Sequence, residues 1–189
     1  MCSLRPPSAT NFWPPRSKPG NPWEHWDYNR IRNDCGLLTG TNLAIINNWP
    51  LIHAALVAEG QASKNSQAAD IATVAIETAS TFRPVREAYW LYDVDPAAAY
   101  RYYADTTKHA PYAGGPWAHG RGFIQTTHAY NIIAILGPIP ADAVSEHELH
   151  LWADQLLEPV KAAYAFGRYW VSRGIGAIAD RGDWRAVRS

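Results

Sequence analysis

Apolar residues recur at intervals of three and four through most of the chain after residue 35, and sustained alternation of apolar and polar residues is absent. This period is typical of helices that pack one side into a core. The segments with helical spacing are 42–48, 51–59, 67–80, 96–103, 145–157, 159–172 and 183–187. The pattern predicts a mainly α domain with at most a small β-hairpin near Gly120 to Gln125.

Residues with known preferences for helix ends flank several of these segments. Thr41 is placed to cap the first helix, Pro50 suits the first position of the second, and Gly60 suits its end. Ser66 is placed to cap the helix that follows. A loop rich in glycine, proline and aromatic residues is expected over 106–119.

The first 35 residues have a different composition, with six prolines among serines, asparagines and basic residues. Proline lacks an N–H group and fixes φ, so such a segment resists both helices and sheets. We interpret residues 1–35 as a proline-rich linker or N-terminal arm and residues 36–189 as the folded domain. At 189 residues and 47% hydrophobic content, the chain is long and apolar enough for one such domain.

Charge and cysteine content exclude several classes of protein. Lysine and arginine number 17 against 17 acidic residues, so no overall positive field draws the chain to nucleic acid or anionic lipid. Two cysteines, Cys2 and Cys35, imply no disulfide framework. The sequence contains neither the apolar run of a secretory signal nor a membrane span, so we expect synthesis in a cytoplasm without a signal peptide.

A candidate acid lies in the segment 67–80, which is apolar on most of its surface and therefore predicts a central, buried helix. Asp70, Thr73 and Glu77 form its polar stripe. Glu77 falls in the last turn, where the helix dipole and burial both raise a carboxyl pKa. A carboxyl that stays protonated near neutral pH suits a general acid. The alternative is a structural Glu77 that is paired with a buried partner.

A second candidate carboxyl, Glu87, follows ten residues later. Pro84 ends the helical pattern before it, and Arg83 and Arg86 lie close in sequence. If these cations are also close in space, they keep Glu87 ionised. Two carboxyls with pKa values driven apart meet the requirement for glycoside cleavage, in which one protonates the leaving oxygen and the other activates water. The alternative is that Glu87 forms a surface ion pair.

The segment 120–131 joins a glycine turn, Gly120-Arg121-Gly122, to a short apolar run and then to polar residues. Glycine lets a backbone approach a ligand closely, and the amides and hydroxyl that follow suit sugar hydroxyl and N-acetyl groups. A structural turn that precedes a helix explains the same residues equally well.

This segment resembles the Gly-Arg-Gly-x-Ile-Gln signature of glycoside hydrolase family 19, the chitinases and related phage endolysins of the lysozyme superfamily. The resemblance spans residues from about 40 to the end of the chain, and it implies a two-lobed, lysozyme-like helical domain with a cleft. In that family a glutamate at the end of a buried helix is the general acid, which corresponds here to Glu77 before Thr78. A second glutamate after arginine or lysine is the base, which corresponds to Glu87 after Arg86.

The resemblance implies further roles around these two carboxyls. It implies that Gln125 and Asn131 hold the substrate, that Thr127 helps to place the water, and that Tyr130 lines the cleft. With the aromatic loop included, the candidate substrate-binding residues are Gln125, Thr127, Asn131, Tyr130, Tyr112, Trp117 and His119. The segment 179–188 is similar to the family's last such segment. No cofactor and no metal are expected.

The chain departs from the family pattern at two places. Ile76 stands where the family usually has histidine beside the acid. The family commonly continues into an Ile-Asn-Gly segment, whereas this sequence ends at Ser189. We therefore expect either a domain truncated at its C-terminus or a missing substrate contact.

Other functions remain as alternatives. His147-Glu148-Leu149-His150 is similar to a zinc motif, but its histidines are three residues apart where the helical metalloprotease pattern needs four. The nine tryptophans and ten tyrosines also suit a noncatalytic wall-binding module that stacks on sugars. A lytic transglycosylase needs the buried glutamate but no second carboxylate, and a chitinase needs the same residues as a peptidoglycan hydrolase.

The hypothesis that these observations favour is an endolysin-type hydrolase that cleaves β-1,4 bonds of bacterial peptidoglycan with inversion and so lyses a host cell. Inversion predicts carboxyl groups about 6.5 to 9.5 Å apart, which leaves room for a water molecule. The expected partner is the glycan of N-acetylglucosamine and N-acetylmuramic acid, with no nucleic acid and no membrane insertion. We expect a monomer within a larger modular protein, which reaches the wall after release by a separate membrane protein.

Overall fold

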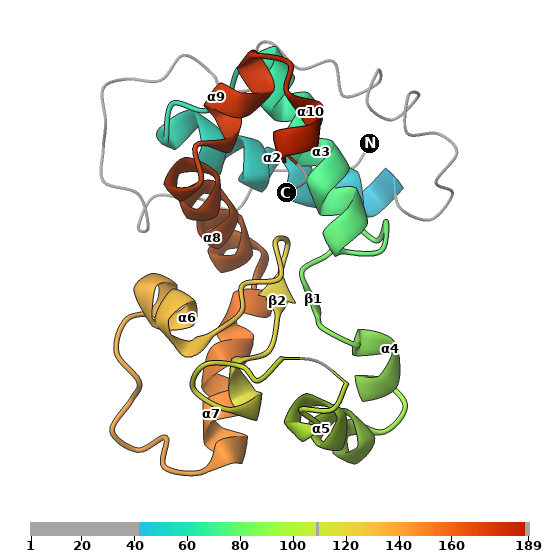
Figure 1. Ribbon diagram of the computed structural model, residues 1–189, viewed down its shortest axis with the longest axis vertical. Helices are drawn as coiled ribbons and strands as arrows, with labels where there is room; N and C mark the ends of the chain where they lie inside the picture. Colours follow the sequence, from blue (N-terminus) through green and yellow to red (C-terminus); the bar gives the residue numbers. More distant parts are fainter. Residues whose placement is uncertain (1–41, 109, 188–189) are drawn as a thin grey trace, which may run out of the picture.

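The computed structural model describes residues 42–108 and 110–187, and in this part of the chain the fold is mainly helical with one two-stranded antiparallel sheet. The mainly α prediction is therefore confirmed. Figure 1 shows one group of helices above the sheet and another below it. The predicted arm 1–35, the cap at Thr41 and both cysteines lie outside the described residues.

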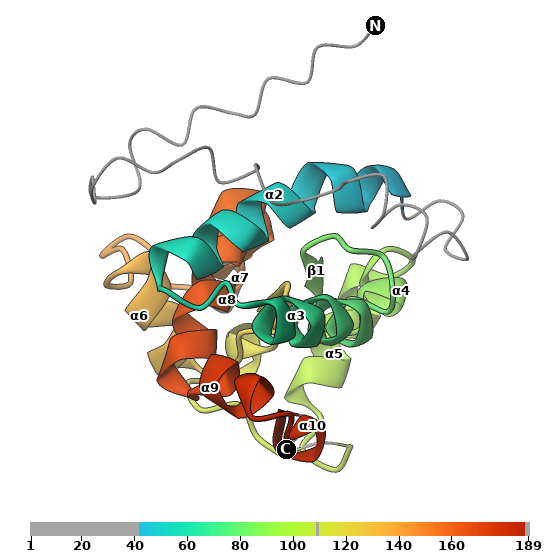
Figure 2. The same ribbon diagram turned by 90° about the horizontal axis from the view of Figure 1, so that it is seen from above.

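The upper group of helices is built from segments at both ends of the described chain. It comprises α2 (Asn42–Ala58), α3 (Lys64–Glu77), α8 (Pro159–Ser172), α9 (Ile175–Asp180) and α10 (Trp184–Val187). Helix α2 packs along α8, and α3 packs on α9 (Figure 2). Trp49, Leu56, Phe166 and Trp170 belong to the buried core between them.

The lower group consists of shorter elements. It comprises α4 (Tyr89–Tyr92), α5 (Pro96–Ala104), the 3-10 turn η1 (Pro116–Ala118), α6 (Ala129–Leu136), α7 (Glu146–Ala153) and the 3-10 turn η2 (Asp154–Leu157). A second core lies around Trp117, Ile132 and Trp152, and a small third core lies around Ala99 and Tyr103. Helix α8 packs into the first two cores, through Phe166 and Ala165 respectively, and so joins the two groups.

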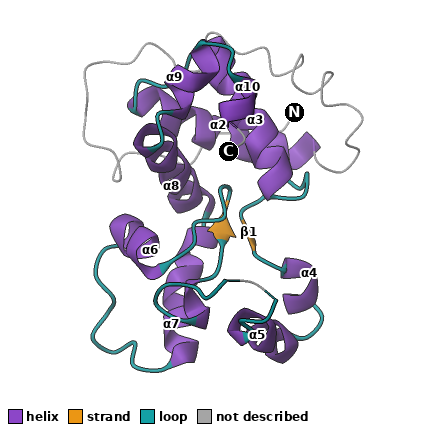
Figure 3. Ribbon diagram, in the orientation of Figure 1, coloured by secondary structure: helices purple, strands orange, loops and turns teal. Residues whose placement is uncertain are grey.

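The sheet pairs β1 (Val85–Arg86) with β2 (Arg121–Gly122), and Figure 3 shows it between the two groups of helices. Val85 lies opposite Gly122, and Arg86 lies opposite Arg121. The predicted hairpin near Gly120 to Gln125 is present only as a tight turn closed by a bridge between Arg121 and Thr126. The main partner of β2 is the distant β1, which the local sequence pattern does not indicate.

The prediction of two helices separated at Pro50 is wrong, because α2 runs unbroken from Asn42 to Ala58 with Pro50 inside it. Proline removes one backbone hydrogen bond. Burial of Trp49 and Ile52 on either side holds the helix together at this position. Gly60, with φ +70°, ends the helix region as predicted, since glycine adopts this conformation without strain.

Helix α3 is displaced from its predicted bounds of 67–80. Its N-cap is Ser63, whose hydroxyl accepts a hydrogen bond from the Ser66 N–H at 3.0 Å. Ser66, predicted as the cap, lies inside the helix and accepts a hydrogen bond from the Trp170 indole at 2.8 Å. The helix ends at Glu77, so this residue lies in the last turn, as predicted, and occupies its final position.

The buried side of α3 also differs from the prediction. Ser66, Ala69, Asp70 and Val74 face the interior, whereas Ala72 is exposed and Ile76 is 65% exposed. Alanine side chains offer little apolar surface, so contacts with α9 and with Trp170 decide which side turns inward. As a result one member of the polar stripe, Asp70, lies in the core.

The remaining helices agree with the pattern in part. Helix α8 has the predicted bounds, α5 is one residue longer than predicted, and Ser145 caps α7 through a capping box with Glu148. Helices α4, α6 and α9 were not predicted. None of the helices in the described ranges has the length and apolar character needed to cross a membrane.

Candidate active site

Glu77 is the last residue of α3, and the end of this helix lies beside the start of β1 in both views (Figures 1 and 2). Its side chain is half-buried, and burial raises the pKa of the carboxyl. The carbonyl end of a helix also disfavours a negative charge, which favours the protonated form of the carboxyl as burial does. Glu77 is therefore suited to hold a proton that a substrate atom can receive.

The turn after Glu77 is fixed to the upper core. The Thr78 hydroxyl donates to the Val74 carbonyl at 2.7 Å and accepts from the Phe82 N–H at 3.0 Å. The Phe82 carbonyl in turn accepts from the Asn48 amide of α2 at 2.7 Å. These bonds restrain the end of α3 and the segment that leads into β1.

Glu87 directly follows β1, and both oxygens of its carboxyl group accept hydrogen bonds. The Tyr112 hydroxyl donates to one oxygen at 2.8 Å, and the Gly120 N–H donates to the other at 3.1 Å. The Glu87 N–H donates to the Gly120 carbonyl at 2.8 Å, and the Tyr103 hydroxyl donates to the Glu87 carbonyl at 2.6 Å. The orientation of this carboxyl is thus fixed by groups from three other segments.

Neither of the two arginines near Glu87 in sequence forms an ion pair with its carboxyl, so the proximity on which the expectation of an ionised Glu87 depended is absent among the described residues. Arg86 pairs with Asp154, and its Nε lies 3.1 Å from the carboxyl. Arg83 is exposed and makes no ion pair within the described part of the chain. Successive side chains of a strand point to opposite faces, which directs Arg86 and Glu87 apart.

Arg121, the cross-strand neighbour of Arg86, is fully buried and reaches the same carboxyl. Its Nε donates to Asp154 at 2.7 Å, and its Nη1 donates to the carbonyls of Trp117 and His119 at 2.7 and 2.9 Å. Asp154 therefore holds one arginine from each strand. No sequence pattern identified Asp154, because it is 68 residues from Arg86 and 33 from Arg121.

The segment 120–131 brings Gln125 and Thr127 next to Gly120, and therefore close to the Glu87 carboxyl. A Cβ atom at Gly120 would lie 2.9 Å from the Gln125 Oε1 and 3.2 Å from the Thr127 Oγ1. The Gln125 amide donates to the Val85 and Gly122 carbonyls at 3.0 and 3.1 Å. The Gln125 side chain thus connects the loop to both strands, and its side-chain oxygen Oε1 faces Gly120.

Thr127 and Asn131 also bond within this loop. The Thr127 hydroxyl donates to the backbone carbonyl of Gln125 at 2.6 Å, and the Asn131 side-chain amide donates to the backbone carbonyl of Thr127 at 2.8 Å. Asn131 is exposed and Thr127 is half-buried, so both keep surface for a ligand. Whether they contact a substrate stays a prediction, and their bonds in this structure stabilise the loop.

The four aromatic candidates divide into two pairs. Tyr130 is 62% exposed beside His128, and Tyr112 is half-buried on Glu87. Trp117 and His119 are buried in the core, where the His119 ring stacks on Tyr103 at 3.6 Å. Burial, followed by the positive charge of Arg121, lowers the His119 pKa far below its usual value. Trp117 and His119 therefore present no surface to a sugar in this structure, and their predicted contact stays a prediction.

Left-handed backbone conformations concentrate around these residues. Non-glycine residues with positive φ in the described ranges are Ala79, Ser80, Phe82, Ala88, Gln125 and His128. Three follow Glu77, one follows Glu87, and two lie in the segment 120–131. Such conformations cost about 1 to 3 kcal/mol each and persist where surrounding contacts impose them, which is common at functional sites.

Two residues of the segment His147-Glu148-Leu149-His150 have other roles. Glu148 accepts from Ser145 in the capping box, and His150 is buried with its Nδ1 3.2 Å from Arg121. Burial lowers the His150 pKa to about 4. Over the described ranges, no three His, Cys, Asp or Glu side chains come together in a group that would hold a metal ion.

Comparisons with models of known protein families, with curated protein sequences and with solved structures find no match to this chain. The interpretation of the site therefore depends on its chemistry and on the motifs described above.

Proposed function

We propose that this chain is a glycoside hydrolase that cleaves β-1,4 bonds of bacterial cell-wall glycan with inversion. The observation that carries the proposal is the contrast between two carboxyl groups. Glu77 lies half-buried at a helix end with a raised pKa, whereas Glu87 accepts two hydrogen bonds that fix its orientation. Glycoside cleavage needs one carboxyl that gives a proton and one that takes a proton from water.

In the proposed reaction, Glu77 gives its proton to the glycosidic oxygen as the bond between that oxygen and the anomeric carbon breaks. A water molecule bonds to the anomeric carbon from the opposite face, and its proton passes to Glu87. The oriented carboxyl of Glu87 supports this assignment, because a base acts efficiently only from a defined position.

The substrate class is proposed from groups of the segment 120–131. Exposed Tyr130 offers an aromatic face for a sugar ring, and Asn131 and the Gln125 carbonyl oxygen offer hydrogen-bonding groups for N-acetyl and hydroxyl groups. Together with the resemblance to endolysins, these groups favour peptidoglycan as the substrate. The enzyme would reach the cell wall after its release by a separate membrane protein.

The experiment is mass spectrometry of fragments from purified peptidoglycan and from chitin after digestion with wild type, Glu77→Gln and Glu87→Gln. We expect each substitution to lower the rate about 10²- to 10⁴-fold while folding is kept, since this is the usual contribution of a general acid or base. Exposed Asp142→Asn is the matched control, with the wild-type rate expected.

Each other outcome identifies a competing function. Unchanged cleavage by Glu77→Gln contradicts the assignment of the acid. Anhydro sugar ends, together with an unchanged rate in Glu87→Gln, indicate a lytic transglycosylase. Cleavage of chitin alone indicates a chitinase, and wall binding without any cleavage by wild type indicates a binding module.

A further inference from the structure

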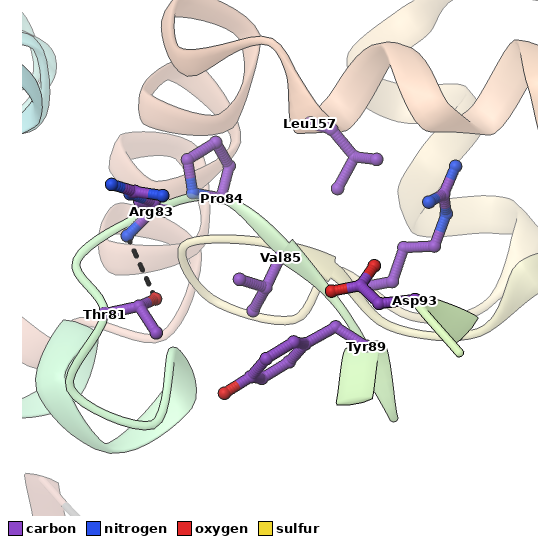
Figure 4. A pocket seen from close by; sticks show the side chains of 8 residues that line it. Thr81, Arg83, Pro84, Val85, Tyr89, Asp93 and Leu157 are labelled. Atoms are coloured by element: carbon purple, nitrogen blue, oxygen red, sulfur yellow. Dashed lines mark hydrogen bonds between the residues drawn. The ribbon is translucent and has the colours of Figure 1, made fainter. Parts of the chain in front are cut away.

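A pocket with a cavity of about 270 Å³ lies between the segment after α3, β1, α4 and η2. Figure 4 shows the side chains that line it, which are Thr81, Arg83, Pro84, Val85, Arg86, Tyr89, Asp93 and Leu157. Val85 and Arg86 directly precede Glu87 in the chain, so part of the pocket belongs to the strand that leads to the proposed catalytic residue. Its cavity is smaller than the roughly 300 to 1,000 Å³ of pockets for drug-sized ligands, so it accommodates only part of a larger polymer.

The floor of the pocket is apolar, and Arg83 and Asp93 lie on either side of it. Pro84, Val85 and Leu157 lie between Arg83 and Asp93, which occupy opposite sides of the view in Figure 4. These two opposite charges are therefore separated across an apolar surface, and Arg86 adds a second positive group to the lining.

Three polar groups of the pocket have no partner within the described residues. The guanidinium of Arg83, the hydroxyl of Tyr89 and the carboxylate of Asp93 make no side-chain hydrogen bond or ion pair with the described part of the chain. The other charged group, Arg86, differs because Asp154 already pairs with it. Arg83 and Asp93 are thus the groups that remain available to a ligand.

We propose that this pocket binds the peptide stem of peptidoglycan, with Arg83 receiving a carboxylate and Asp93 an amino group. This inference rests on the proposed function. The stem carries carboxylates and, at a diamino acid that is not cross-linked, a free amino group, whereas chitin and the sugar backbone carry no such pair. A carboxylate matches the planar fork of arginine, and the apolar floor accommodates the aliphatic part of the stem.

The pocket gives the site a means of distinguishing peptidoglycan from chitin. Both polymers contain N-acetylglucosamine, so contacts to the sugar alone do not separate them. Contacts to a charged side branch do separate them, because a ligand without the branch leaves Arg83 and Asp93 without partners.

The test measures binding by titration calorimetry with a muramyl tripeptide whose third residue is a diamino acid. This probe has no β-1,4 bond, so wild-type protein is used and nothing is cleaved. We expect Arg83→Gln and Asp93→Asn each to weaken binding about 5- to 10-fold, as for the loss of a partly exposed charge-assisted hydrogen bond. The monosaccharide N-acetylglucosamine, which also has no β-1,4 bond, is expected to bind all variants equally.

The matched control is Arg101→Gln, an exposed arginine on α5 paired with Asp95, which is expected to bind the tripeptide as wild type does. The proposal is overturned if either Arg83→Gln or Asp93→Asn binds the tripeptide as tightly as wild type does. It is also overturned if wild type binds N-acetylmuramic acid as tightly as the tripeptide.

Glycan cleavage by the same preparations separates the two proposals. Charge-dependent tripeptide binding without any cleavage supports the pocket and overturns the proposed hydrolase. Cleavage by wild type with charge-independent tripeptide binding supports the hydrolase and overturns the pocket.

Discussion

At the residue scale, Asp70 is a carboxyl group buried in the core of the described part of the chain without a hydrogen-bond partner there. It is fully buried on the inner side of α3, and neither carboxyl oxygen has a hydrogen-bond partner in the described residues. Desolvation raises its pKa well above the usual value. An unpaired buried carboxylate is costly, so the folded protein keeps Asp70 neutral by binding a proton.

Asp70→Asn is therefore expected to reduce the dependence of stability on pH. The pKa of Asp70 is raised in the folded state, so its favourable contribution is complete below the unfolded pKa of about 3.9 and is lost as pH rises toward the folded pKa. Between these values the free energy of unfolding of wild type should fall relative to the variant by up to about 1.4 kcal/mol per pH unit. Urea unfolding at pH 4.5, 6.0 and 7.5 measures this difference.

Exposed Asp142→Asn serves as the control and should leave the pH dependence as in wild type. Parallel stability curves for wild type and Asp70→Asn would contradict the assignment of a neutral Asp70.

At the element scale, helix ends were easier to predict than helix sides. Ser145 with Glu148 three residues later predicts the start of α7 because the two residues satisfy each other's backbone groups locally. Pro159 likewise marks the start of α8. The choice of the inner side of α3 depends on Trp170, about one hundred residues away, which local spacing does not reveal.

The turn of β2 also depends on close packing. Gly120→Ala should lower the free energy of unfolding by about 1 to 3 kcal/mol, because its Cβ would meet the Gln125 side chain at 2.9 Å and force it to move. The same movement disturbs Glu87, which accepts a hydrogen bond from the Gly120 N–H. Chemical unfolding measures the loss of stability, and the glycan-cleavage rate should fall with it.

Gly60→Ala provides the comparison. Its φ is +70° and no atom lies within 4 Å of an added Cβ, so the substitution costs only backbone strain, about 1 kcal/mol, without loss of cleavage. A cleavage rate in Gly120→Ala equal to that of Gly60→Ala would show that Gly120 does not position Glu87.

At the scale of the whole molecule, the sheet and Asp154 connect elements that are far apart in sequence. Asp154 follows α7 and pairs with Arg86 of β1 and Arg121 of β2. Directly after β1, Glu87 bonds to Gly120 and Tyr112. The two strands that carry Glu87 and Gly120 are thus held together by an ion-pair network with Asp154.

Asp154→Asn is expected to destabilise the protein by about 3 to 5 kcal/mol, because it leaves fully buried Arg121 without its counter-ion. Glu59→Gln, which removes the surface pair with Arg168, should cost less than about 1 kcal/mol. Thermal or chemical unfolding of the two variants under identical conditions tests the comparison. Similar losses for both would show that the network contributes no more than a surface pair.

The sequence by itself determined the helical class and several helix ends, among them both ends of α8, and it supplied the two carboxyls as candidates. These features depend on local spacing, capping and backbone chemistry, all of which act over a few residues. The glycine turn at Gly120 and the position of Glu77 at a helix end are features that depend on such local signals.

Only the tertiary structure decided which groups surround those carboxyls. It directed Arg86 to Asp154 rather than to Glu87, brought Tyr112 onto the Glu87 carboxyl, and buried His119 on Tyr103. It also placed Asp70 in the core. Each of these outcomes depends on contacts between distant segments, whose partners are selected by packing of the whole domain and not by the pattern of any one segment.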